Sequence, residues 1–121
     1  MKKIVSVIAA MFLAMGLVAV TAAPAQAYTY KQNKVWTFVK KHAPVGASIM
    51  GKFDSIDRAK TTCKFLKSGY DYDDVIEVTA AAAYDAGLDN DTADVFFEWA
   101  AAADFGGIKY LCPGQWSKVD L

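Results

Sequence analysis

Hydrophobic residues recur at helical spacing in four stretches of this chain, and no stretch shows the alternation of a β-strand. The first stretch covers residues 31–42 and is expected to end before Pro44 and Gly46. Its apolar face comprises Val35, Phe38, Val39 and His42. The pattern therefore predicts an amphipathic helix whose last residue, His42, packs against the core.

A second helix is predicted over residues 55–68, with Asp54 as its N-cap and Gly69 as its C-terminal stop. Its apolar stripe comprises Ile56, Ala59, Cys63 and Leu66, which points Cys63 inward. Phe65 lies off this stripe, so it is either covered by a second neighbour or exposed. The segment 43–53 is predicted to be a loop.

Two further helices are predicted over residues 73–86 and from about Asp91 onward. Aspartates supply capping oxygens and negative charge at both starts: Asp71, Asp73 and Asp74 at the first, and Asp89 or Asp91 at the second. The last helix is apolar around most of its circumference, which predicts a central position. Gly106 and Gly107 either break or kink it. Together the four stretches predict a small all-α domain, either orthogonal or bundle-like.

The first 27 residues have the three parts of a signal peptide: Lys2 and Lys3, an apolar run over 4–20, and small residues before a cleavage point. We expect cleavage after Ala27, which leaves residues 28–121 as a single secreted domain without a second apolar span. The alternative is an uncleaved membrane anchor, because the run approaches the ~20 residues that a membrane helix needs.

Charged residues are balanced in number but not in position. The chain has 13 basic and 13 acidic residues, which argues against a general nucleic-acid binder. Residues 28–69 nevertheless carry a net charge of +7, and residues 70–121 carry −9. Either the two halves attract each other when they dock, or they form a two-signed surface that orients a partner. The basic half also offers a face for an anionic polymer.

Cys63 and Cys112 are the two cysteines of the chain. Because disulfides persist outside the cytoplasm, an exported chain with two cysteines predicts a Cys63–Cys112 bridge. Closing a loop of about 50 residues would contribute about 4 kcal/mol in the chain-entropy model. The alternative is a pair of buried free thiols.

Motifs for catalysis or metal binding are weak in this sequence. His42 is the only histidine, and the sequence assigns it neither a nucleophile nor an orienting partner. The two aspartate clusters fail the EF-hand spacing and stand where carboxylates cap helices. We therefore predict no catalytic residue, no cofactor and no metal ligand.

Apolar and aromatic residues outside the helical stripes form the candidate interaction surface, which comprises Ile49, Met50, Phe53, Tyr70 and Tyr72. Exposed aromatic side chains stack on sugars or on protein partners. The alternative is that these residues fold over the ends of the bundle.

Five parts of the chain together match the pattern of a known family. They are residues 59–63, Gly69, the acidic start at 73–75, the turn at 86–88, and the closing residues 110–113 with Cys112 and Pro113. Together they resemble domain of unknown function 732, a small exported domain found mainly in mycobacteria and related actinobacteria. The resemblance implies a disulfide-linked helical fold and no assigned activity. The chain departs from the pattern in residues 100–107, where about seven added residues equal two helical turns and preserve the facing of the helix.

The sequence therefore predicts a small secreted binding or interaction module of the cell envelope or extracellular space. Its partner would be an unidentified protein or envelope component, and the chain would act as a monomer or weak oligomer. The alternatives are a small exported hydrolase that acts on the cell envelope and a purely structural envelope protein. A pocket that gathers carboxylates with His42 would favour the hydrolase, and an apolar patch would favour the binding module.

Overall fold

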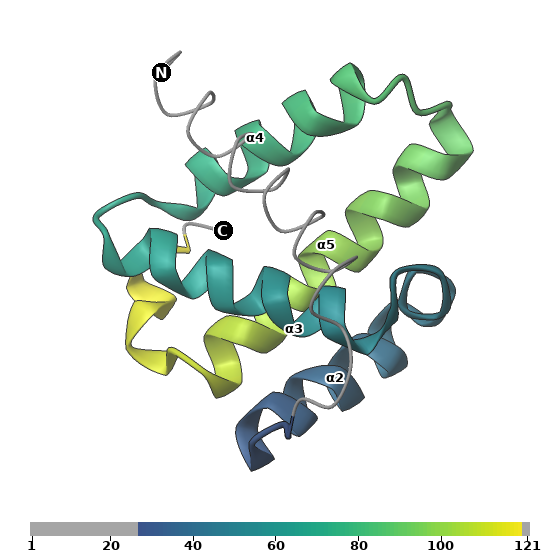
Figure 1. Ribbon diagram of the computed structural model, residues 1–121. Coiled ribbons are helices and arrows are strands. Elements are labelled where there is room, and N and C mark those ends of the chain that lie inside the picture. Colours follow the sequence, from purple (N-terminus) through teal and green to yellow (C-terminus); the bar gives the residue numbers. More distant parts are fainter. Residues whose placement is uncertain (1–26, 120–121) are drawn as a thin grey trace.

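Four α-helices and a short 3-10 helix make up residues 27–119, the part of the chain that the computed structural model describes (Figure 1). In chain order they are α2 (Tyr30–His42), α3 (Pro44–Lys67), α4 (Tyr72–Asp85), α5 (Asn90–Tyr110) and η1 (Pro113–Lys118). These residues contain no strand, so the predicted all-α, four-helix class is confirmed. The predicted signal peptide lies outside the described residues, apart from Ala27.

Side-chain caps explain where the helices begin. Thr29 precedes α2 and accepts a hydrogen bond from the backbone N–H of Gln32 at 3.1 Å, and the Gln32 side chain accepts one from the Thr29 N–H at 3.0 Å. Asp71 and Asp74 form the same reciprocal pair at the start of α4. Asp89 accepts a backbone N–H bond in the first turn of α5 at 2.7 Å. The predicted capping role of these aspartates is therefore confirmed for Asp71 and Asp89.

The prediction of a loop over residues 43–53 is wrong, because all of them except Ala43 belong to α3. Proline lacks a backbone N–H and fits the first turn of a helix, so Pro44 begins α3 as well as following α2. The helix is interrupted at Gly51, whose φ of 86° is a conformation that side chains with a Cβ rarely adopt. Asp54 consequently lies inside α3 and is not its N-cap.

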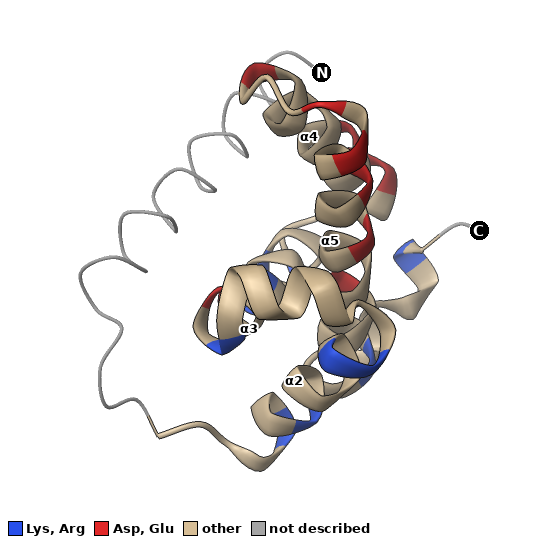
Figure 2. Ribbon diagram, turned by 90° about the vertical axis from the view of Figure 1, so that its right-hand side faces the viewer, with Lys and Arg blue, Asp and Glu red and all other residues tan. Residues whose placement is uncertain are grey.

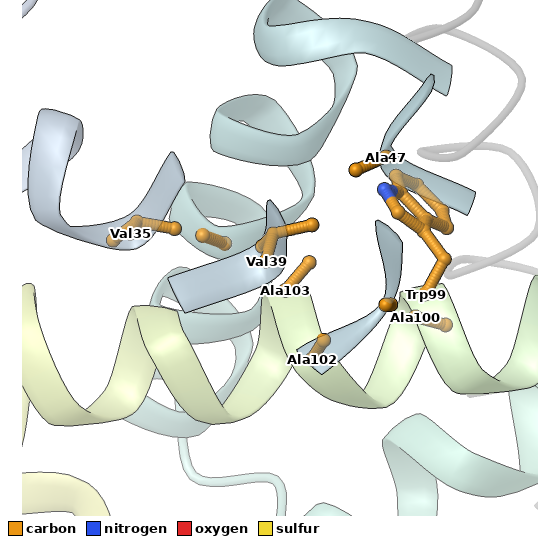
Figure 3. Close-up of a cluster of buried hydrophobic side chains, with 9 residues drawn as sticks. Val35, Val39, Ala47, Trp99, Ala100, Ala102 and Ala103 are labelled. Atoms are coloured by element: carbon orange, nitrogen blue, oxygen red, sulfur yellow. The ribbon is translucent and has the colours of Figure 1, made fainter. Parts of the chain in front are cut away.

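The central position predicted for the last helix is confirmed, because α5 supplies the middle of the main core (Figure 3). The buried residues of this core are Val35, Val39, Ala43, Ala47, Ala59, Trp99, Ala100, Ala102 and Ala103. Two glycines allow close helix contacts: a Cβ on Gly46 would lie 2.4 Å from the Trp99 Cβ, and one on Gly107 would lie 2.8 Å from the Ala59 Cβ. The Gly106–Gly107 pair does not end α5, which continues to Tyr110.

His42 is exposed, and the prediction that it packs against the core is wrong. Phe38 occupies the space beside α5, since a Cβ on Gly106 would lie 3.1 Å from the Phe38 Cδ1. The His42 ring packs on Phe38 from the outside, with 4.3 Å between the ring centroids. Of the two alternatives for Phe65, covered or exposed, the first is confirmed: Phe65 is buried and packs on the ring of Tyr70, with 5.4 Å between the ring centroids.

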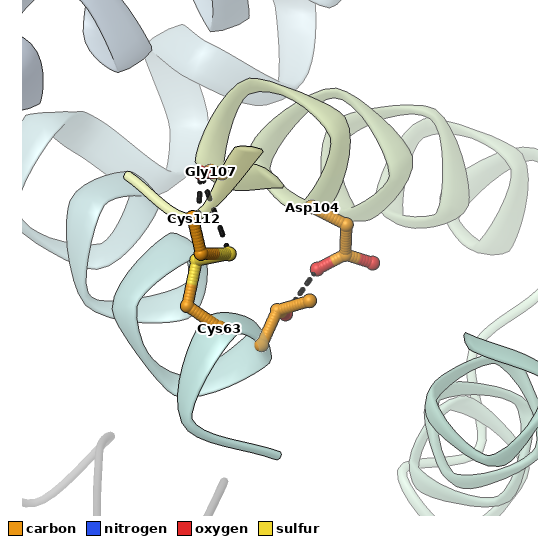
Figure 4. Close-up of a disulfide and its surroundings, with 5 residues drawn as sticks. Cys63, Asp104, Gly107 and Cys112 are labelled. Atoms are coloured by element: carbon orange, nitrogen blue, oxygen red, sulfur yellow. Dashed lines mark hydrogen bonds between the residues drawn. A yellow bond between two sulfur atoms is a disulfide. The ribbon is translucent and has the colours of Figure 1, made fainter. Parts of the chain in front are cut away.

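A second buried cluster surrounds the disulfide, which joins Cys63 of α3 to Cys112 directly after α5 (Figure 4). Their Cα atoms are 5.9 Å apart, and the predicted bridge is confirmed. The other members of the cluster are Leu66, Tyr72, Val75 and Ile108. The disulfide therefore fixes α3 against the C-terminal end of α5.

The charged residues are separated in space as they are in sequence. Lysines mark α2 and α3, whereas aspartates and glutamates follow α4 and α5 (Figure 2). Among residues 27–119, the salt bridge that joins the two halves is the buried pair Arg58–Asp104. In the same part of the chain, no helix is both long and apolar enough to cross a membrane.

Replacing both cysteines by serine (Cys63→Ser with Cys112→Ser) should lower the free energy of unfolding by about 4 kcal/mol, because the unfolded chain regains the freedom of the closed loop. Urea unfolding of both proteins measures the difference. Reductant should destabilise the wild type by a similar amount and leave the double variant unchanged. A loss below about 1 kcal/mol would contradict the role of the bridge.

Gly107→Ala should destabilise the protein by about 1–3 kcal/mol, because the new methyl group would press against Ala59. Alanine normally favours a helix interior by about 1 kcal/mol over glycine, so the close contact reverses the usual sign. Gly114→Ala is the matched control, since a Cβ there meets nothing within 4 Å. A Gly107→Ala variant as stable as the wild type, measured by thermal unfolding, would rule out this close approach of α3 and α5.

Candidate functional site

A buried ion pair lies where α3, α4 and α5 meet. Arg58 of α3 and Asp104 of α5 are each 2% exposed. The guanidinium binds the carboxylate through a bidentate pair of hydrogen bonds: Nε donates to Oδ1 and Nη2 donates to Oδ2, both at 2.9 Å. Paired charge-assisted hydrogen bonds of this kind are strong and directional. The pair therefore fixes α3 and α5 in one relative position.

Three hydroxyl groups complete this buried network. Thr62 donates to Asp104 Oδ1 at 2.5 Å, and Tyr72 donates to Oδ2 at 3.0 Å. Arg58 Nη2 also donates to Thr79 Oγ1 at 2.8 Å, and that hydroxyl donates in turn to a backbone carbonyl one turn earlier. Asp104 accepts four hydrogen bonds, which is the capacity of a carboxylate. Because Tyr72 and Thr79 belong to α4, the network also attaches α4 to the other two helices.

Tyr72 stays a hydrogen-bond donor throughout the ordinary pH range. Burial and the neighbouring Asp104 carboxylate raise the pKa of Tyr72 far above its usual value. Its ring packs on Phe105 with 5.2 Å between the centroids. The residue therefore has a fixed place in the interior and holds its proton toward Asp104.

The network extends along α3 through Trp99. The Arg58 guanidinium carbon lies 5.8 Å from the centre of the Trp99 ring. Trp99 Nε1 donates to Ser55 Oγ at 2.9 Å, and Ser55 donates to the carbonyl of Gly51 at 2.7 Å. The interruption of α3 at Gly51 is thus tied to the same set of polar contacts.

An open cleft of about 360 Å³ lies over this network, between α4 and α5. Its polar residues, here called the cleft floor, are Arg58, Tyr72, Thr79 and Asp104. Its apolar walls come from Ile76 of α4 and from Phe97, Ala100, Ala101 and Phe105 of α5. The two helices spread apart from the turn that joins them (Figure 1). Ile76 is 50% exposed and Phe97 38%, so apolar surface faces solvent at the cleft.

Carboxylates flank the apolar walls of the cleft. Asp73 lies one helical turn before Ile76 on α4, and Asp94 lies one turn before Phe97 on α5, so each shares a face with its apolar neighbour. Both aspartates are exposed. Acidic residues follow α4 and α5 (Figure 2), so the cleft between these helices is an apolar surface within the acidic half of the molecule.

The five residues of the predicted interaction surface do not share one environment. Ile49 is 69% exposed, whereas Met50 packs against the main core and Phe53 is half-buried. Tyr70 packs on Phe65, as described above. The prediction is wrong for Tyr72, which is 5% exposed, because its hydroxyl reaches Asp104 from the first turn of α4.

The cleft floor was not predicted from the sequence, although a signal was present. Arg58 is the sole arginine among the 13 basic residues. Arginine is preferred over lysine where a buried carboxylate is bound by two parallel hydrogen bonds. Asp104 directly follows a run of four alanines in the most apolar helix. A single arginine and a carboxylate in an apolar stretch together indicate a buried pair.

The arrangement offers little for acid–base chemistry. Both oxygens of Asp104 are occupied by internal donors, and His42 does not line the cleft. Within residues 27–119, no group of three or more His, Cys, Asp or Glu residues is placed to hold a metal ion. The chemistry that the cleft supports best is the reversible binding of apolar groups.

Arg58→Met should lower the free energy of unfolding by about 3–5 kcal/mol, because it leaves the Asp104 carboxylate buried without its partner. Arg58→Met combined with Asp104→Leu should recover much of this loss, since neither charge then remains. Urea unfolding of the two variants measures both effects. Equal stability of the single and double variants would contradict the pairing.

Comparison with known proteins gives one informative result. The family model described as Protein of unknown function (DUF732) matches residues 31–105, more than half of the chain. The match contains the whole cleft floor and ends before the closing Cys112–Pro113. No curated protein and no solved structure matches the chain. The chain therefore belongs to the DUF732 family of proteins of unknown function.

Proposed function

We propose that this chain is an exported binding module that holds the apolar face of a positively charged helix of a protein partner in the α4–α5 cleft. The observation that carries the proposal is the open apolar cleft on the acidic half of the molecule. The disulfide and the signal-peptide pattern both support an exported protein, since disulfides persist outside the cytoplasm.

Apolar contact would supply most of the affinity. The cleft has a volume of about 360 Å³ and is lined mainly by apolar side chains. Ile76 and Phe97 expose apolar surface there, and burying such a side chain completely contributes about 1.5–3 kcal/mol. The floor needs no polar group from a ligand, because its ion pair is already hydrogen-bonded within the protein.

The shape and charge of the cleft favour an amphipathic helix over a small molecule. The cleft is open to solvent and bounded by two diverging helices, a surface on which side chains of a third helix can anchor. Asp73 and Asp94 flank its apolar walls, so basic residues beside the apolar face of a partner would meet opposite charge. Such complementarity accelerates encounter and selects the partner.

The proposal predicts binding of a synthetic amphipathic helix made of leucine and lysine, measured by calorimetry with the disulfide-bonded protein. Ile76→Ser should weaken this binding by about tenfold, because a partly buried isoleucine contributes about 1.4 kcal/mol or more. Ile49→Ser is the matched control: this side chain is also exposed but does not line the cleft, so binding should be unchanged.

A second peptide, in which glutamate replaces lysine, tests the contribution of charge and should bind more weakly at low salt. Equal losses from the Ile76→Ser and Ile49→Ser variants would place binding elsewhere on the surface. Equal affinity for the two peptides would contradict the choice of a cationic partner.

A further inference from the structure

We infer that a lysine-lined groove on α3 is a second binding site, for a linear anion that carries two or more phosphate groups. The groove has a volume of about 290 Å³. Its lining residues are Gln32, Lys60, Cys63, Lys64, Lys67 and Leu111, none of which lines the α4–α5 cleft. All of these residues except Leu111 belong to the basic half of the chain, and the inference is independent of the function proposed above.

Three lysines line this groove, and within the described part of the chain no carboxylate forms a salt bridge with them. Lys60, Lys64 and Lys67 are all exposed, and their spacing places them along one face of α3. Among residues 27–119, no salt bridge joins any of them to an acidic side chain. The charge of Lys60 does act on Asp57, one turn earlier, where it partly offsets the rise in the pKa of Asp57 that burial causes. The groove itself has no acidic lining residue.

A fourth donor comes from a different helix. Gln32 of α2 lines the groove, and its side-chain oxygen already accepts the backbone N–H of Thr29 at 3.0 Å. This bond orients the side chain, and its amide NH2 group is the donor that a ligand in the groove would meet. Donors from two separate helices around one hollow are typical of a binding site and are not needed to cap α3.

The helix dipole explains only part of the arrangement. Lys64 and Lys67 lie in the last turn of α3, where cations oppose the partial negative charge of the helix end. Lys60 lies about two turns before that end, beyond the reach of this effect. Its position beside Gln32 at the groove would let one anion contact both helices.

The disulfide holds the groove in shape. Cys63 lines it and is bonded to Cys112, whose neighbour Leu111 lines it from the other side. The backbone on both sides is thus fixed before any ligand arrives, which reduces the entropy lost on binding.

The spacing of the lysines indicates the class of ligand. The backbone of α3 rises by about 10 Å from Lys60 to Lys67, more than one phosphate group can bridge with short contacts. A chain of phosphates can contact successive lysines, and lysine binds phosphate as a compact point charge. No aromatic ring lines the groove, so the site has no surface for stacking a nucleobase or a sugar.

Calorimetric titration with tripolyphosphate tests this inference. The double variant Lys60→Gln with Lys64→Gln should weaken binding by about tenfold. The control is Lys40→Gln with Lys41→Gln, which removes the same charge from the basic half outside the groove and should change the affinity less than about threefold. Titration with single inorganic phosphate should show much weaker binding than tripolyphosphate.

Sedimentation with vesicles of cardiolipin, a lipid whose headgroup carries two phosphates, separates a lipid source of the phosphates from a soluble one. Loss of either interaction in the Lys60→Gln, Lys64→Gln variant alone supports the site and identifies its source. Equal losses in the two double variants would show diffuse electrostatic attraction and overturn the inference, as would absence of binding to both probes. Ile76→Ser should leave tripolyphosphate binding unchanged, so the two proposals can fail separately.

Discussion

The buried pair of Arg58 and Asp104 is the constraint on which the rest of this structure depends. Removing two charges from water costs several kcal/mol for each ion, and a pair is tolerated only when further hydrogen bonds complete it. Thr62, Tyr72 and Thr79 supply those bonds from two helices. The need to satisfy one guanidinium and one carboxylate therefore fixes α3, α4 and α5 together at a single point.

This constraint also shapes the surface. α2, α3 and α5 share a tightly packed core of alanines, valines and Trp99, while α4 reaches the other helices through Tyr72, Val75 and the polar network. A helix attached along part of its length leaves apolar surface beside it, and the α4–α5 cleft is that surface. The disulfide fixes α3 at Cys63, directly after Thr62 of the network and beside the lysine-lined groove. The apolar cleft thus lies mainly in the acidic half, and the lysine-lined groove lies mainly in the basic half.

Local features of this fold were predictable from sequence, and features that depend on distant contacts were not. Helical spacing and the aspartate caps predicted the helices, because both depend on neighbours in the chain. The disulfide was predicted because the chain has two cysteines and an export signal pattern. Pro44 was interpreted only as the end of the first helix, and its role as the first residue of α3 was missed, because proline can follow one helix and begin another. Tyr72 was wrongly assigned to the surface and Arg58 was not singled out, because helical spacing assigns polar residues to solvent, whereas their partner Asp104 lies more than thirty residues away in sequence.

Native-state amide hydrogen exchange tests most directly whether the polar network holds α4 in place. The informative variant is Tyr72→Phe with Thr79→Val, which removes the side-chain hydrogen bonds from α4 and leaves Arg58 and Asp104 facing each other. We expect faster exchange throughout α4, with the protection of α2 and α5 close to that of the wild type. Unchanged protection of α4, or an equal loss in every helix, would contradict this role of the polar network.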